Sequence, residues 1–265
     1  MTRRLATPLV LMLACATFVG SVRAQETAPP QAPARPALKA LDDGELSGVW
    51  GQALIDLTNT SLNGYEFSRL TLNADITLSA TLTGLKLGTQ ASGASDIDFT
   101  SLNFGRSDLD DAHRTVAIAN PYFEWVYAGS AATGDRQVVG MRVGFGGISG
   151  DVGLAMNTLS GSLSLNTPTG QASTLGSQST ALTGCAGACT IALNQIGGVT
   201  AGDSNGASRD FFLSVLKSAV AYPAANAALG ASATAQAGFW MNWTDRLNAI
   251  NTTGATPPNV PKIGP

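Results

Sequence analysis

A few side chains in this 265-residue sequence belong to types that hydrolases use. Residues 202–206, Gly-Asp-Ser-Asn-Gly, match the G-x-S-x-G string that carries the serine nucleophile of α/β-hydrolases. That motif needs a strand before it, a helix after it and a histidine base later in the chain. Here the string lies in a polar loop, and the single histidine, His113, precedes it. We therefore interpret residues 202–206 as a turn and predict that the protein is not an enzyme.

His113 lies beside an acidic stretch that offers two other kinds of chemistry. A neighbouring carboxylate can orient a histidine as a general base, although a lone histidine among charges is more commonly solvated. Five carboxylates within sixteen residues could also bind Ca²⁺, which prefers oxygen ligands: Asp96, Asp98, Asp108, Asp110 and Asp111. Their spacing matches neither an EF-hand nor an RTX repeat. The sequence leaves open whether they bind calcium or form a solvated acidic edge, and it identifies no cofactor site and no assigned metal ligand.

The N-terminus has the three parts of a secretory signal peptide. Two arginines give a positive start, residues 5–19 are apolar, and Val-Arg-Ala at 22–24 is a small-residue cleavage site. We expect residues 1–24 to be removed, and a lipoprotein signal at Cys15 is the alternative. Without its three arginines the chain has 12 basic and 18 acidic residues, a net charge of −6. The sequence therefore predicts an exported protein that lacks the basic surface of a nucleic-acid binder.

Two cysteines, Cys185 and Cys189, follow the signal peptide. An exported chain reaches an oxidising compartment, and an even pair separated by small residues suits a local disulfide. The alternative is a redox or metal pair. It lacks the two-residue spacing of redox motifs and a histidine or second cysteine pair to complete a zinc site. We predict a structural disulfide.

The aromatic side chains gather in two places that are candidate interaction sites. Trp125 and Tyr127 fall on one face of a predicted strand, and Trp240 and Trp243 lie in a second cluster. An exposed aromatic strip would bind a glycan, a lipid or another protein. Core packing is the alternative and the more usual role of such residues.

Composition divides the rest of the chain into four segments. Residues 25–40 form a proline-rich linker, residues 41–53 carry a distinct motif, residues 54–250 form a β-rich domain, and residues 251–265 form a proline-rich tail. Hydrophobic residues make up 44% of the sequence, so the domain can bury a core.

Alternation of apolar and polar residues is the main secondary-structure signal. Residues 69–82 alternate over fourteen positions and predict one long strand. Shorter strand-like segments follow between turn residues, among them 137–146, 151–159 and 161–167, whereas 209–222 also fits a helix. We predict an all-β, mainly antiparallel fold, as an elongated sandwich or solenoid-like sheet, with a β-barrel as the alternative.

Residues 41–52 contain the skeleton L-x-D-x-E-L-S-x-V-x-G-Q. It resembles a motif at the mature N-terminus of many exported proteins of Gram-negative bacteria, some of them labelled as pilus-system or outer-membrane-associated proteins and most uncharacterised. Residues 120–128 and 137–153 are also similar to recurring segments of that group. The skeleton is similar as well to the leader of double-glycine-secreted peptides, but Gln52 replaces the second glycine. The first resemblance implies an envelope or surface location and brings no catalytic residues.

These observations lead to one expected function and one alternative. We expect a non-catalytic exported cell-envelope or surface protein with a structural, adhesive or assembly role in a pilus-like system. Its partners would be other envelope or surface proteins, with outer-membrane association left open. The alternative is an outer-membrane barrel or β protein that binds or transports an apolar ligand.

Overall fold

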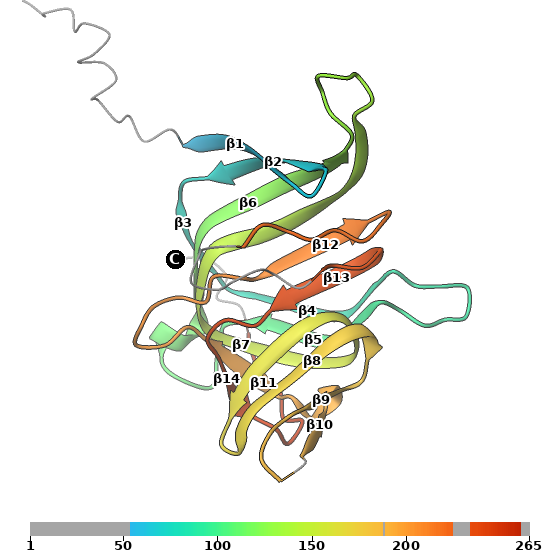
Figure 1. Cartoon of the computed structure of the whole chain (residues 1–265). Helices are drawn as coiled ribbons and strands as arrows, with labels where there is room; N and C mark the ends of the chain where they lie inside the picture. Colours follow the sequence, from blue (N-terminus) through green and yellow to red (C-terminus); the bar gives the residue numbers. More distant parts are fainter. Residues whose placement is uncertain (1–53, 188, 225–233, 261–265) are drawn as a thin grey trace, which may run out of the picture. The chain divides into compact units, whose positions relative to one another are not determined.

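The computed structural model describes residues 54–187, 189–224 and 234–260, and within them the chain is almost entirely antiparallel β-sheet (Figure 1). The predicted all-β class is confirmed. The predicted signal peptide, linker and motif segment, residues 1–53, lie outside the described residues. No helix in the described ranges is long and apolar enough to span a membrane.

The strands are described in two groups, those that precede the long central strand β7 in the sequence and β7 with those that follow it. The earlier ones are β1 (Ile55–Leu62), β2 (Tyr65–Leu72), β3 (Asp75–Leu78), β4 (Ala80–Leu87), β5 (Ile97–Phe104) and β6 (Val116–Ala128). The central and later ones are β7 (Gln137–Thr167), β8 (Gly170–Ser179), β9 (Ala181–Thr183), β10 (Thr190–Ala192), β11 (Gly198–Ala201), β12 (Phe212–Leu216), β13 (Gly238–Trp243) and β14 (Leu247–Asn251). Two short 3₁₀ helices are η1 (Asp111–Arg114) and η2 (Leu193–Gln195).

The main path through the sheet is β1-β2-β6-β7-β8-β9-β10, and β7 is its centre. The first part of β7 pairs with β6 and β12, and its second part pairs with β5, β8 and β11. β13 joins the two parts, because it pairs antiparallel with β12 and parallel with residues 161–163 of β7. Figure 1 shows β6 and β7 curving together as neighbours. The sheet remains open, since its path ends at β1 and at β10 within the described residues.

Two hydrophobic cores stabilise this arrangement. The larger one collects buried side chains from the second part of β7 and the strands around it, including Leu154, Leu163 and Trp243. The smaller one contains Phe67 of β2 and Trp240 of β13 together with residues of β6 and β12. The two cores therefore occupy different parts of the sheet, and burial of their apolar area is the main stabilising contribution.

Residues 69–82 do not form one strand, so that prediction is wrong. They divide among β2, β3 and β4. β2 and β3 pair with the same neighbour, β6, and the chain between them turns where the Ala74 N–H donates to the Leu72 carbonyl at 2.9 Å. The register on β6 shifts by one residue at this break: Leu70 of β2 lies opposite Phe123, whereas Ile76 of β3 lies opposite Ile118, on the other face of β6. β4 then leaves β6 and pairs with β5.

The longest strand is instead β7, with 31 residues. The sequence predicts three separate segments there, because glycines interrupt the pattern as they do in turns. In the structure a glycine allows a neighbouring strand to approach: a Cβ at Gly161 would lie 2.2 Å from the Met241 carbonyl oxygen of β13. Residues 209–222, the helix candidate, contribute the strand β12.

The described part of the predicted tail, residues 251–260, packs against β4 and β5. The Asn103 side-chain amide donates to the Pro257 carbonyl at 2.9 Å. The Asn259 amide donates to the Phe104 carbonyl at 2.7 Å. These contacts attach the proline-containing segment to the domain.

Candidate functional site

One face of the sheet formed by β1, β2, β6 and β7 changes from polar to apolar along the strands. Residues directly opposite one another on neighbouring strands project from the same face. Three rows cross this face: Ser61–Glu66–Tyr127, then Asn59–Ser68–Trp125–Met141, then Leu57–Leu70–Phe123–Val143. The predicted interaction residues Trp125 and Tyr127 thus lie together on it, in adjacent rows.

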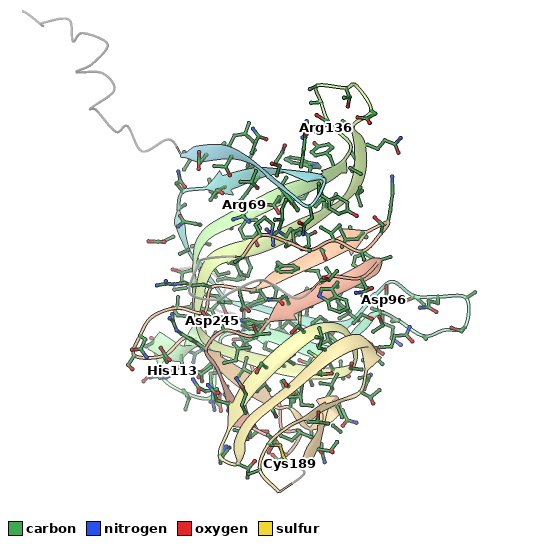
Figure 2. All side chains as sticks on the ribbon, viewed as in Figure 1. Arg69, Asp96, His113, Arg136, Cys189 and Asp245 are labelled. Atoms are coloured by element: carbon green, nitrogen blue, oxygen red, sulfur yellow. A yellow bond between two sulfur atoms is a disulfide. The ribbon has the colours of Figure 1, made fainter. Side chains whose placement is uncertain are left out.

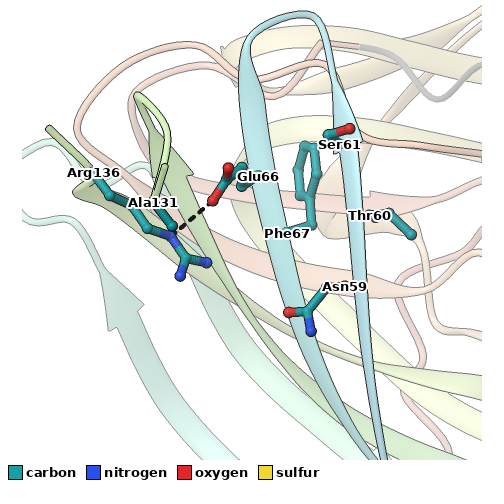
Figure 3. A pocket seen from close by; sticks show the side chains of 7 residues that line it. All are labelled: Asn59, Thr60, Ser61, Glu66, Phe67, Ala131 and Arg136. Atoms are coloured by element: carbon teal, nitrogen blue, oxygen red, sulfur yellow. Dashed lines mark ion pairs between the residues drawn. The ribbon is translucent and has the colours of Figure 1, made fainter. Parts of the chain in front are cut away.

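The polar end of this face borders an open pocket of about 380 Å³ (Figure 3). Arg136, in the loop between β6 and β7, forms an ion pair with Glu66, with Nε 3.0 Å from Oε2. The same guanidinium lies 3.6 Å from the centre of the Tyr127 ring and donates to the Ser68 hydroxyl at 3.0 Å. Ser68 in turn donates to the Asn59 side-chain oxygen at 2.7 Å. A cation, an aromatic ring and several hydrogen-bonding groups therefore meet at this pocket.

Strand β1 forms the outer border of the site. Within the described residues it pairs only with β2, through a two-residue turn in which Asn63 and Gly64 both have positive φ angles, 51° and 81°. In such a hairpin Leu62 and Tyr65 exchange both backbone hydrogen bonds. Because the pattern alternates along the strand, Ser61, Asn59, Leu57 and Ile55 direct their N–H and C=O groups away from β2. All of β1 before Leu62 is exposed. Among the residues between 54 and 260 that the structure describes, this strand therefore presents a free backbone edge.

The apolar end of the face is also accessible. Leu57 is 62% exposed, and Leu70, Met141 and Val143 are exposed as well. The Phe123 and Trp125 rings pack edge to face with centroids 4.5 Å apart. Such a cluster of exposed large apolar side chains on a soluble surface is typical of an interaction site.

The opposite face of the same strands buries charges. Glu124 accepts from Arg142 Nε at 2.6 Å and from Arg69 Nε at 2.8 Å. The Arg142 guanidinium also lies 4.0 Å from the centre of the Tyr222 ring. Burial raises the pKa of the Tyr122 and Tyr222 phenols, so both remain neutral. This face is paired and packed, which leaves the other face as the accessible one.

The second predicted aromatic pair is not at the surface. Trp240 is 1% exposed and lies in the smaller core, and Trp243 is 2% exposed and lies in the larger one. The Trp243 indole N–H donates to the buried Ser208 hydroxyl at 2.9 Å. Their burial corrects the expectation that they contact a partner: both have the alternative, core-packing role.

Cys185 and Cys189 form the predicted disulfide. It closes a loop of sequence separation 4, next to β10 and remote in sequence from the exposed face. Its role in the structure is to fix a local turn.

His113 and the acidic residues form small, separate pairs. The His113 Nδ1 lies 2.6 Å from Asp110 Oδ1 at η1, and the hydrogen bond between them raises the pKa of the imidazole and lowers that of the carboxyl. Asp108 pairs with Arg106 at 2.7 Å, while Asp96 accepts from a backbone N–H of β13. Figure 2 shows Asp96 and His113 well apart. The described residues contain no group of three acidic, histidine or cysteine side chains able to hold a metal ion, so the geometry does not favour calcium in this stretch.

Sequence reasoning missed Glu66, Arg136 and the free edge of β1. The Asn63-Gly64 dipeptide is a strong hairpin signal that could have identified the edge strand. No local pattern marks Arg136, whose partners come from β2 and β6 at distances set by the fold.

The fold and this face define a class: an all-β sheet protein with an accessible face that is polar at one end and apolar at the other, beside an edge strand that pairs on one side only within the described residues. Comparisons with family models, curated proteins and solved structures find no match for this chain.

Proposed function

We propose that this chain is a non-catalytic, exported cell-envelope or surface protein with a structural, adhesive or assembly role. Its partner is another envelope or surface protein, which adds an extended strand to β1. The observation that carries the proposal is the exposed free edge of β1. Export rests on the signal-like residues 1–24, and the envelope location rests on the resemblance of residues 41–52.

The composition of β1 supports strand addition. Natural edge strands usually avoid pairing with other chains through lysine, proline or inward-pointing charges. β1, with the sequence IDLTNTSL, has one charged residue, Asp56, and no proline. Strand addition supplies affinity through backbone hydrogen bonds, and pockets beside the edge supply specificity through alternate side chains.

The neighbouring face provides such specificity. Trp, Tyr and Arg are the residue types most enriched at the energetic centres of protein interfaces. Trp125 and Tyr127 of β6 lie on this face and are separated from β1 by β2, and Arg136 contacts Glu66 and Ser68 of β2. The pocket of about 380 Å³ includes residues 59–61 of β1 itself. A side chain of the added strand would enter this pocket and meet the Glu66–Arg136 pair.

The surroundings of the single histidine, His113, support a non-catalytic role. Its side chain is paired with Asp110 at an exposed turn. Ser204, the serine of the G-x-S-x-G string, lies in a turn closed by Asp203 and Gly206. In neither arrangement is a nucleophilic side chain hydrogen-bonded to a general base.

Photo-crosslinking in the native cell tests the proposal. A photoreactive residue at Thr60 should give one major adduct with an envelope protein. Leu57→Lys should remove the adduct, because a lysine on an edge strand opposes pairing. Leu175→Lys is the matched control, since Leu175 is 65% exposed on β8. No adduct at Thr60, or equal loss in both variants, would refute strand addition at β1.

A further inference from the structure

A small, partly enclosed cavity lies where β4 and β5 pack over β7, β12 and β13. It measures about 70 Å³, and every lining side chain is leucine, isoleucine, methionine, phenylalanine or tryptophan. Leu102 of β5, Leu213 of β12, and Met241 and Trp243 of β13 are among them. The site is distinct from the polar pocket beside β1, which has other lining residues.

The chemistry of the lining determines what the cavity can hold. A buried water needs two to four polar partners, and apolar cavities stay dry and take up apolar guests. A volume of about 70 Å³ corresponds to roughly two groups of the size of water or a methylene. The cavity therefore suits the end of an apolar molecule rather than a whole ligand.

The exposed apolar row continues, strand by strand, to two residues that line this cavity. Phe123 lies opposite Val143, Val143 opposite Leu213, and Leu213 opposite Met241. Val143 is exposed, Leu213 is half-buried and Met241 is buried, so accessibility falls step by step toward the cavity. Leu82 of β4, which is also exposed, lies opposite Leu102 and projects from the same side.

We propose that the cavity and this row bind one linear hydrocarbon chain, with the terminal methyl end in the cavity and the following methylenes along Leu213, Val143 and Phe123. An apolar row that ends at an apolar cavity matches a linear chain. A flat surface, such as that of a second copy, would cover the row and leave the cavity unfilled. This site is independent of strand addition at β1, so either proposal stands if the other fails.

Trp243 allows a direct test, because it lines the cavity, whereas Trp240 lies in the other core. The full chain carrying Trp50→Phe and Trp125→Phe is titrated with two monomeric fatty acids. These are ω-bromoundecanoic acid, with bromine at the methyl end, and α-bromoundecanoic acid, with bromine beside the carboxylate. Bromine quenches tryptophan on contact. We expect saturable quenching by the ω-bromo acid to about half of the emission, and little quenching by the α-bromo acid.

Chain length gives a second measurement on the unaltered protein. Displacement of the ω-bromo acid by unbrominated fatty acids should improve about fourfold with each added methylene until the row is filled.

A variant tests the cavity itself. Leu102→Phe, which occupies cavity space, should weaken binding by roughly fourfold, the contribution of one methylene. Leu175→Phe, on exposed β8, should leave it unchanged.

Four results would overturn the proposal. The first is equal quenching by the two bromo acids, and the second is affinity that does not depend on chain length. The third is quenching only by vesicles of brominated phosphatidylcholine, which would indicate a membrane surface as the partner. A dimer in light scattering together with no quenching would equally overturn it, in favour of a second copy on the row.

Discussion

Replacing Glu124 with alanine should reveal how strongly the buried charges hold β2, β6 and β7 together. Glu124 is the shared acceptor for Arg142 at 2.6 Å and Arg69 at 2.8 Å. The side chains of Glu124 and Arg142 are each 3% exposed, whereas Arg69 is 29% exposed. The two ion pairs therefore differ in their access to water although they share one carboxylate.

That difference sets the expected magnitudes. Glu124→Ala leaves the Arg142 guanidinium buried without its partner, and losses of this kind cost about 3–5 kcal/mol. Such a loss is a large part of a typical unfolding free energy of about 5–15 kcal/mol. Arg69→Ala removes a pair in contact with solvent, and we expect a cost of about 1 kcal/mol or less.

A double replacement separates the effect of losing the ion pair from the cost of burying an unpaired charge. Glu124→Leu with Arg142→Met removes both charges and fills similar volumes, so the double variant should be about as stable as the original chain or more stable. The Arg142 Nη2 has no hydrogen-bond partner among the described residues, which adds to the cost of burying this guanidinium.

Urea unfolding of the four chains measures these differences as midpoint shifts at constant slope. A loss of less than about 1 kcal/mol in Glu124→Ala would refute the reasoning, since it would mean that water reaches Arg142. A double variant as unstable as Glu124→Ala would do so as well, because the packing and not the unpaired charge would then be responsible.

Reduction of the Cys185–Cys189 disulfide should lower the unfolding free energy by about 2 kcal/mol, because so short a loop restricts the unfolded chain only modestly; urea midpoints with and without reductant measure this. The single imidazole signal in an NMR pH titration should show a His113 pKa above 6.5, and Asp110→Asn should return it toward that value. The contribution of this pair to stability is therefore complete between about pH 3.8 and pH 6.5; it is lost as pH rises through the raised His113 pKa and as pH falls through the lowered Asp110 pKa. Gly161→Ala should destabilise the protein by about 1–3 kcal/mol in thermal melts, because its Cβ would meet a β13 carbonyl oxygen at 2.2 Å; an unchanged melting temperature would contradict the close approach.

The sequence predicts those features of the fold that depend on local chemistry. The Cys185–Cys189 disulfide is predicted from the spacing of the two cysteines and the expected export of the chain, and the all-β class follows from period-two alternation. Strand boundaries are less predictable, because they depend on the neighbour. The alternation in residues 69–82 continues while the chain changes from β6 to β5 as its partner.

The candidate site depends on pairing between distant strands. Arg69 and Glu124 are 55 residues apart in the sequence, and Glu124 and Arg142 are 18 apart. Their contact follows from the registers of β2, β6 and β7, which no local pattern in the sequence specifies. The same registers assemble the exposed rows, so Trp125 is predictable as an aromatic on a strand face, but its neighbours Ser68 and Met141 are not.

One part of β2 and β6, around Arg69 and Glu124, departs from the usual relation between alternation and burial. An antiparallel sheet commonly buries its apolar face and exposes its polar one. Here Arg69 and Glu124 lie on the packed face, and Leu70 and Phe123 lie on the accessible one. The ion pairs offset the cost of burying charges on the packed face, since each buried charge has a partner. The apolar side chains on the accessible face are not covered by any other part of the described residues. Burying them against a ligand or partner would therefore be favourable through the hydrophobic effect. We therefore propose this face, more than any single side chain, as the place where the molecule binds a ligand or partner.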